Sequence, residues 1–239
     1  MGRHGTIANR KSAQDSKRAA MFTKYARQII VAAKSGGDPN FNPSLRVAID
    51  KAKGIGMPND NINRAIKKGT GELGGESYEE KTFEGYGPSG VAVIVECLTD
   101  NNNRTTAFVR STFDKNGGNL GTSGCVSYMF SKKGVIILDS EDLDEEEVMM
   151  AALDAGAEDM VVNEDSFEIL TEPGAFNDVH TAIKEAGYDI VEANIESIPS
   201  MEANVTDPEA IKVLTKLINT LEDNDDVQNV YYNCTLPEE

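Results

Sequence analysis

The sequence predicts an α+β multidomain protein in which three N-terminal helices precede two α/β domains, the third domain being inserted into the second. Three observations predict this arrangement. Start and stop signals delimit three helices before residue 70. A complete β-α-β-β-α-β series occupies residues 135–195, and an incomplete β-α-β series lies on each side of it. The two incomplete series complement each other, so we expect two ferredoxin-like domains, one of them split.

The three helices are marked by capping residues, glycines and prolines. Ser12 is a suitable N-cap, and Gly36-Gly37 ends the first helix near residue 34. After a connection rich in turn residues, a second helix is expected over 44–53. Pro58 suits the first position of a third helix, which Gly69 ends.

After the helices, runs of β-branched and aromatic residues alternate with amphipathic segments. The acidic, glycine-rich stretch 69–80 is predicted to be a linker. The expected elements are strand 91–98, helix 105–116, strand 125–130, strand 135–138, helix 143–155, strands 160–163 and 166–170, helix 175–186, strand 190–195, strand 201–205, helix 208–221 and strand 227–233. The corresponding domains are a basic helical domain at 1–75, a split domain at 76–130 plus 199–239, and an inserted acidic domain at 131–198.

Charge is distributed very unevenly along the chain. The net charge is −17, which by itself argues against a nucleic-acid partner. Residues 1–70 nevertheless carry 14 Lys and Arg against 4 Asp, whereas residues 131–239 carry 5 Lys against 28 acidic residues. This polarity indicates that the N-terminal domain contacts a polyanion, and that the acidic domains face away from it.

The candidate nucleic-acid contacts are the cations of the N-terminal domain and one arginine beyond it. On a helical wheel, the first helix places most of its cations opposite its apolar arc, whereas Arg18 lies on the apolar side. The Gly54–Pro58 turn is compatible with a helix-turn-helix, although any three-helix bundle contains such a turn. Arg104 lies in the stretch Asp100–Thr105, which either meets a phosphate at a helix N-terminus or only caps that helix. The candidates are Arg3, Arg10, Lys11, Lys17, Arg18, Lys24, Arg27, Lys34, Arg46, Lys51, Lys53, Arg64, Lys67, Lys68 and Arg104.

Enzyme signatures are weak, so we predict no catalytic residues, no cofactor and no metal site. The stretch Gly85–Gly90 matches G-x-G-x-x-G but precedes a strand, and a hairpin or a strand entry is the favoured interpretation. The glycines of residues 117–124 suggest a phosphate cradle, but a tight helix-to-strand connection is favoured. The acidic run 142–147 lacks the spacing of a calcium loop and fits the first turn of a helix. Neither H-E-x-x-H, nor G-x-S-x-G, nor a Walker A sequence is present.

The remaining features indicate a cytoplasmic protein. The three cysteines, Cys97, Cys125 and Cys234, are odd in number and widely spaced, as is typical of reduced thiols. No apolar run is long enough to span a membrane, and the N-terminus lacks the apolar stretch of a signal peptide.

Several long stretches resemble the YebC/PmpR family. They are R-K-S-A-Q-D-S-K-R-A-A-M-F-T-K-Y-A-R from Arg10, G-G-D-P-N-F-N-P-S-L-R-V-A-I-D-K-A-K from Gly36, and M-P-N-D-N-I-N-R-A-I-K-K-G-T-G-E from Met57. Two further stretches are F-E-G-Y-G-P-S-G-V-A-V-I-V-E-C-L-T-D-N-N-N-R-T from Phe83 and G-G-N-L-G-T-S-G-C-V-S-Y-M-F from Gly117. Many members begin with G-H-S-K-W, whereas this chain reads G-R-H-G-T-I, so that Ile7 replaces an aromatic residue.

The resemblance implies a three-domain protein with a helical first domain and two α/β domains. Family members are described as probable DNA-binding transcriptional regulators, and relatives, including a mitochondrial one, act in translation at the ribosome. The resemblance also implies that the cations of residues 10–27 and 64–68 contact nucleic acid. We therefore expect a non-enzymatic DNA-binding regulator of transcription, with a ribosome-associated translation factor that binds structured RNA as the alternative. The expected partners are DNA, RNA or both, no membrane, and a basic protein for the acidic domains; the sequence sets no oligomeric state.

Overall fold

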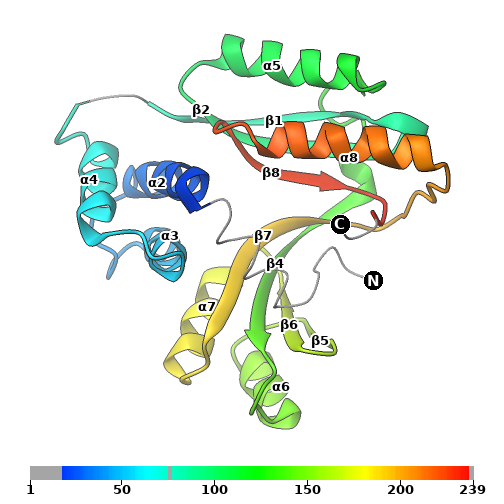
Figure 1. The fold of residues 1–239 in the computed structure, drawn as a ribbon. Helices are drawn as coiled ribbons and strands as arrows, with labels where there is room; N and C mark the ends of the chain where they lie inside the picture. Colours follow the sequence, from blue (N-terminus) through cyan, green and yellow to red (C-terminus); the bar gives the residue numbers. More distant parts are fainter. Residues whose placement is uncertain (1–17, 75–76, 237–239) are drawn as a thin grey trace. The chain divides into compact units, whose positions relative to one another are not determined.

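The computed structural model describes residues 18–74 and 77–236 (Figure 1). The fold class is confirmed, because three helices precede two four-stranded sheets, each with its own helices. The chain forms two compact units. One contains the described residues of Gly74–Ser131 and Ser197–Glu239, and the other contains those of Gly2–Leu73 and Lys132–Glu196. The helical segment and the inserted sheet therefore belong to one unit, while the boundaries of three separate domains stay a prediction.

The first three described helices are α2 (Arg18–Ala33), α3 (Pro43–Gly54) and α4 (Asn59–Gly69). The start of α3 follows directly from the sequence, because Pro43 is its first residue and the side chain of Asn42 accepts a hydrogen bond from the Leu45 N–H at 3.0 Å. The helices enclose a core to which each contributes small and branched residues. Its fully buried members include Ile29, Ala33, Leu45, Ala52, Ile62 and Ala65. None of the helices in the described part of the chain is long and apolar enough to cross a membrane.

The inserted sheet has the strand order β5-β6-β4-β7, which is the antiparallel order expected from a β-α-β-β-α-β chain. Its apolar face is covered by α6 and α7, whose buried residues Val148, Val179 and Ile183 pack on Ile136 and Ile169 of the strands. The elements are β4 (Phe130–Asp139), α6 (Glu145–Asp154), β5 (Asp159–Val162), β6 (Ser166–Thr171), α7 (Phe176–Glu185) and β7 (Ile190–Pro199).

Within this unit, α3 is shared between the helical bundle and the inserted domain. Val47 of α3 is 5% exposed and belongs to the same buried cluster as the core of the inserted sheet. An ion pair joins Asp50 of α3 to Lys184 of α7, with 2.6 Å between Oδ2 and Nζ. The helical domain thus supplies the anion and the acidic domain the cation, which is the reverse of their overall charges.

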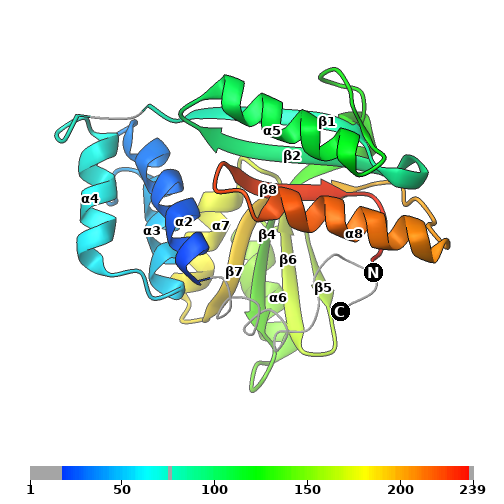
Figure 2. The same cartoon turned by 45° about the horizontal axis from the view of Figure 1, so that its top comes forward.

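The second unit contains the other sheet, with the order β3-β1-β2-β8. Strands β2 and β8 pair although the inserted domain separates them in sequence, as an insertion into the second domain requires. Helices α5 and α8 pack on one face of this sheet, as the rotated view shows (Figure 2). The elements are β1 (Glu79–Tyr86), β2 (Ala92–Thr99), α5 (Asn102–Lys115), β3 (Asn119–Leu120), α8 (Pro208–Glu222) and β8 (Val227–Tyr232).

Three element predictions in this unit are wrong. Strand β1 occupies Glu79–Tyr86, where a linker was expected up to residue 80 and no strand was assigned. Residues 125–130 are not a strand: they contain the 3₁₀ helix Ser127–Met129, and β4 begins at Phe130. Residues 201–205 form no strand either. The apolar side chains of Val126 and Met129 are nevertheless buried, against the sheet face opposite to the helices, which explains their hydrophobic pattern.

The stretch Gly85–Gly90 forms a hairpin, as predicted, and not a dinucleotide-binding turn. It joins the antiparallel strands β1 and β2 through the 3₁₀ helix Pro88–Gly90. The Gly87 N–H donates to the Val91 carbonyl at 2.8 Å and closes the turn. No helix follows it that could present an N-terminus to a pyrophosphate.

Candidate nucleic-acid interface

Four of the predicted contact residues form what we call the exposed basic group. All four side chains are exposed, and within the described parts of the chain no carboxylate lies at ion-pair distance from any of them. They come from the C-terminal turn of α3 and from α4. The group consists of Lys53, Arg64, Lys67 and Lys68.

The sequence of α4 places three of these cations on one side of the helix. Ile62 and Ala65 are 3% and 4% exposed and define the buried side. At 3.6 residues per turn, Arg64, Lys67 and Lys68 fall within an arc of about 100° on the opposite side. Lys67 and Lys68 also lie in the last turn, where the helix dipole favours positive charge. The arrangement is therefore stable without any partner, yet presents three cations together.

The cations of α2 are less accessible than the helical wheel predicted. Lys24 and Arg27 are half-buried, and only Lys34, next to the C-terminal end of the helix, is exposed. Helix α2 is surrounded on more sides than a wheel of one isolated helix can indicate. The predicted contacts Arg3, Arg10, Lys11 and Lys17, and the side chain of Arg18, lie outside what the structure describes and stay predictions.

Arg46 has a structural task that the sequence did not reveal. Its Nε donates to the carbonyl of Pro39 and its Nη2 to the carbonyl of Asn40, both at 3.2 Å. The guanidinium therefore holds the connection between α2 and α3, while its half-buried position keeps part of it accessible.

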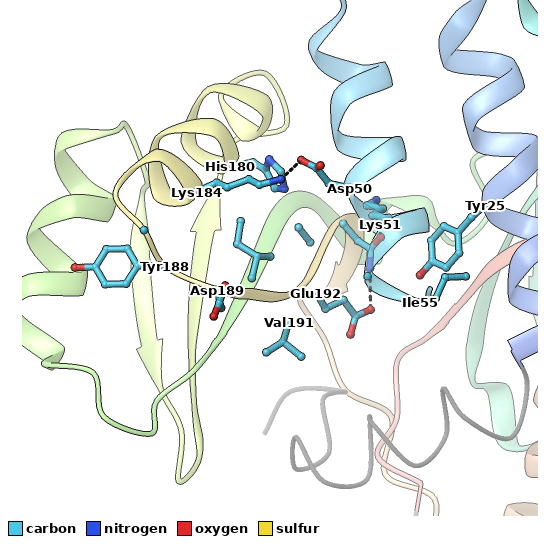
Figure 3. A pocket seen from close by; sticks show the side chains of 15 residues that line it. Tyr25, Asp50, Lys51, Ile55, His180, Lys184, Tyr188, Asp189, Val191 and Glu192 are labelled. Carbon is cyan, nitrogen blue, oxygen red and sulfur yellow. Dashed lines mark hydrogen bonds and ion pairs between the residues drawn. The ribbon is translucent and has the colours of Figure 1, made fainter. Parts of the chain in front are cut away.

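Lys51 points into a cavity instead of outward. The cavity measures about 380 Å³ and lies between α2 and α3 on one side and α7 and β7 on the other (Figure 3). The Nζ of Lys51 donates to Asn194 Oδ1 at 2.8 Å, and Asn194 Nδ2 donates to Glu192 Oε1 at 2.8 Å. Burial lowers the pKa of Lys51 to about 8, although the carboxylates of Glu192 and Glu196 act in the opposite direction.

Two further titratable groups line this cavity. Burial, and secondarily the charge of Glu192, raise the pKa of Tyr25 to about 12. Burial lowers the pKa of His180, against the opposing effect of Asp50, so the imidazole is neutral at neutral pH. His180 is 3% exposed and lies beside the ion pair of Asp50 and Lys184 (Figure 3). The walls thus mix acidic and basic groups and do not attract a polyanion as a basic surface does.

Arg104 is held by carboxylates of its own unit. Its Nη2 lies 2.7 Å from Asp100 Oδ1 and 2.8 Å from Asp226 Oδ2, and its Nε donates to Asp226 at 3.2 Å. Hydrogen bonds to Asp226 and Asp100 raise the pKa of Arg104 above its ordinary value. Asn101 caps α5 by accepting the Arg104 N–H at 3.0 Å. The capping of α5 explains why the Asp100–Thr105 stretch is rich in asparagine. A contact of Arg104 with nucleic acid stays a prediction.

The glycine-rich loop over residues 117–124 leads into a cradle for an anion, but the anion is a side chain of the protein. The carboxylate of Glu84, which is 6% exposed, accepts hydrogen bonds from the N–H groups of Gly124 at 2.8 Å, Val126 at 3.0 Å and Ser127 at 2.9 Å. Burial raises the pKa of Glu84, but these three donors outweigh burial and the net pKa is lowered. Glu84 therefore occupies the position where a phosphate was considered, and the loop leads to the 3₁₀ helix Ser127–Met129 instead of the predicted strand.

We expect Glu84→Gln to destabilise the protein by about 1–2 kcal/mol at neutral pH, because a charge-assisted acceptor is lost. The pKa of Glu84 is depressed in the folded state, so its contribution is complete above the ordinary carboxyl range and is lost as the pH falls through the folded value. Urea unfolding at about pH 7 and about pH 3 measures this. The difference between wild type and variant should shrink at the lower pH; a constant difference would contradict the assignment.

The acidic run at residues 142–147 serves as a helix start. Asp144 caps α6 by accepting the Glu147 N–H at 3.0 Å, and Glu145, Glu146 and Glu147 occupy the first turn. Among residues 18–74 and 77–236, no group of three or more His, Cys, Asp or Glu side chains is placed to hold a metal ion.

One exposed residue of the helical domain was missed by the sequence analysis. Phe41 is 88% exposed, in the connection between α2 and α3. An aromatic residue between two asparagines in a short helix connection is the signal that could have identified it, because such connections are ordinarily polar.

These features define a class: a multidomain α+β protein with an exposed basic group on its N-terminal helices, which are followed in the sequence by two α/β domains. Residues 3–72 match the family model of the TACO1/YebC protein N-terminal domain, and residues 78–234 match that of the TACO1/YebC second and third domain. The chain therefore belongs to the TACO1/YebC family, and the resemblance seen in the sequence is confirmed.

Individual relatives are similar over nearly their whole length. A probable transcriptional regulatory protein of Clostridioides difficile is 55% identical over 98% of this chain and 98% of its own length. One of Geobacter sulfurreducens is 55% identical over 98% of this chain and 94% of its own. Among solved structures, a conserved hypothetical protein of Aquifex aeolicus is 47% identical, with a TM-score of 0.84 over 95% of this chain and 93% of that one.

Proposed function

We propose that this protein is a non-enzymatic regulator of gene expression that binds nucleic acid through its helical domain, and that its target is DNA. The observation that carries the proposal is the exposed basic group on α3 and α4, since no carboxylate of residues 18–74 and 77–236 lies at ion-pair distance from it although the net charge of the chain is −17. Cations that serve only for solubility are ordinarily mixed with acidic residues on the same surface. The relatives named as probable transcriptional regulatory proteins support the same role.

The mechanism is electrostatic attachment to the phosphate backbone. Each Lys or Arg that neutralises a phosphate releases condensed counterions, and this release drives binding. The acidic residues of segment 131–239 are repelled by phosphates, and this repulsion favours orientations in which the basic helices face the duplex. Base readout is assigned to no residue here.

The test is the salt dependence of binding by the full-length protein to a duplex DNA of about 30 base pairs. If the exposed basic group makes four phosphate contacts, the logarithm of the association constant should fall with the logarithm of salt concentration with a slope of about −3.6 or steeper. Salt-independent binding, or no binding at low salt, would reject the proposal.

The alternative, attachment to structured RNA at the ribosome, relies on the same cations. A folded RNA of similar length in the same titration distinguishes the two. Tighter binding to the RNA, together with sedimentation of the protein with ribosomes in a gradient, would replace DNA by RNA as the target. A clear preference for particular duplex sequences would support DNA.

A further inference from the structure

The side chain of Phe41 is unusual because it is exposed although hydrogen bonds hold the backbone of its loop in place. At 88% it is the most exposed of the large hydrophobic residues in the described part of the chain. A single exposed apolar residue is common on protein surfaces and does not mark a site by itself. Two further observations indicate a binding role for this residue: the hydrogen bonds that hold its loop and the cations that lie beside the loop.

Hydrogen bonds hold the loop that carries Phe41 on both sides of this residue. The amide of Asn42 donates to the carbonyls of Ala32 and Gly36, both at 2.8 Å, and thereby fixes the loop to the end of α2. The Phe41 N–H donates to the Asp38 carbonyl at 3.1 Å, and Asp38 Oδ1 accepts the Asn40 N–H at 2.9 Å. With its backbone held in this way, the ring cannot turn inward to join the core, so its exposure is built into the loop.

Cations of all three helices lie at the same end of the bundle as this loop. Gly37 of the loop lies close to Thr70, which directly follows α4. A β-carbon added at Gly37 would come within 2.7 Å of Thr70 Cγ2. The loop therefore adjoins the turn of α4 that carries Lys67 and Lys68. The same end includes Lys34 after α2, and Arg46, whose guanidinium donates to loop carbonyls.

The acidic groups at this end are fewer and are already engaged. The carboxylate of Asp38 accepts hydrogen bonds from the backbone and side chain of Asn40 at 2.9 Å and 3.0 Å. Glu72 accepts a hydrogen bond from the Thr70 hydroxyl at 3.2 Å. The loop and its adjoining helix turns, residues 34–46 and 66–73, carry four cations and two carboxylates, an excess of positive charge that a polyanion favours and a basic protein does not.

An exposed aromatic ring on a loop that adjoins cations matches the chemistry of an unpaired nucleotide. The base stacks on the ring face and the neighbouring phosphates meet Lys and Arg. A base inside a duplex is already stacked on both faces and cannot offer one to the ring. We infer that Phe41 is a base-stacking residue that holds an unpaired nucleobase of single-stranded or looped nucleic acid, an inference that rests on the proposed nucleic-acid binding.

The chain contains no tryptophan, which makes a direct test available. Phe41→Trp introduces a single tryptophan at the stacking position, which can be excited at wavelengths where tyrosine does not absorb, and it keeps a large aromatic face. Full-length Phe41→Trp should be quenched on titration with a 12-nucleotide single strand of RNA or DNA, and not with the duplex of the same sequence. Comparing the RNA strand with the DNA strand shows which source of unpaired bases is preferred.

Phe41→Ala should bind the single strand about 5- to 100-fold more weakly than wild type, which is the range of one base–aromatic stack. Its salt slope should be unchanged, because no cation is removed. Leu73→Ala is the matched control: Leu73 is also apolar and exposed, at 55%, and follows α4, but it has no flat ring. Leu73→Ala should bind as wild type does, and both alanine variants should keep the wild-type melting temperature.

The outcomes separate the two proposals. If wild type binds neither single strand nor duplex, the proposed function fails. If wild type binds with a steep salt dependence while Phe41→Trp is not quenched and Phe41→Ala binds normally, the stacking role fails and the function stands. Equal quenching by the duplex would overturn the requirement for an unpaired base.

Discussion

Replacing all four residues of the exposed basic group by glutamine should weaken binding to duplex DNA by about a thousandfold at 100 mM salt. The substitutions are Lys53→Gln, Arg64→Gln, Lys67→Gln and Lys68→Gln. Each removed phosphate contact should reduce the steepness of the salt dependence by about 0.9, so the slope should become shallower by about 3 to 4. Fluorescence anisotropy of a labelled duplex between 50 and 200 mM salt measures both quantities. The fold should be unaffected, because all four side chains are exposed.

A control with the same total charge distinguishes this surface from a general effect of charge. Four exposed cations of the other unit are replaced in the control: Lys81, Arg110, Lys115 and Lys212, each by glutamine. Both quadruple variants carry the same net charge, so long-range repulsion by the whole molecule is matched. If the control loses as much affinity as the test variant, the basic helices are not the contact surface and the proposed interface is wrong.

Gly69→Ala should destabilise the unit that contains the helices by about 2–3 kcal/mol. A β-carbon on Gly69 would overlap the Ile30 carbonyl oxygen and lie 2.6 Å from the β-carbon of Ala33. Both neighbours belong to the buried side of α2, and a backbone carbonyl cannot rotate away as a long side chain can. Helices α2 and α4 must therefore separate to admit one methyl group. Urea unfolding followed by circular dichroism gives the free energy.

Gly54→Ala is the matched control for Gly69→Ala, because both glycines are the last residue of their helix. A β-carbon on Gly54 meets no atom within 4 Å. The substitution should leave stability unchanged or raise it by about 0.4–1 kcal/mol, since alanine has less conformational freedom to lose on folding. A loss of stability of the same size in both variants would show that glycine is needed for its backbone at helix ends and not for the close approach of α2 and α4.

The sequence predicted the elements that have strong local signals. Helix α3 was expected over 44–53 and extends over Pro43–Gly54, because its cap and its proline act within a few residues. Strand β1 was missed because its first half, Glu79–Thr82, is exposed and polar and so lacks the apolar pattern of a strand. Pairing with β2 defines this half of the strand, and that pairing cannot be read from the local sequence. Residues 125–130 were taken for a strand because buried loop residues are as apolar as strand residues.

The residues of the candidate interface were predictable by type but not by surroundings. A count of Lys and Arg locates the basic domain, and α4 presents its cations as the helical period requires. The partners of Lys51 and Arg104, Asn194 and Asp226, are 143 and 122 residues away in sequence, and no local pattern could have indicated them. Phe41 is uncharged, so the pattern of Lys and Arg that locates the basic domain does not indicate it.

The sharing of α3 has a consequence for how this protein can be divided. Val47 is buried in the core of the inserted domain, while Leu45 and Ala52 of the same helix are buried in the bundle. Excising the N-terminal helices would expose Val47 and the part of the inserted core that it packs against, and the excised piece would tend to self-associate. The helical segment and the inserted domain should therefore unfold together as one cooperative unit.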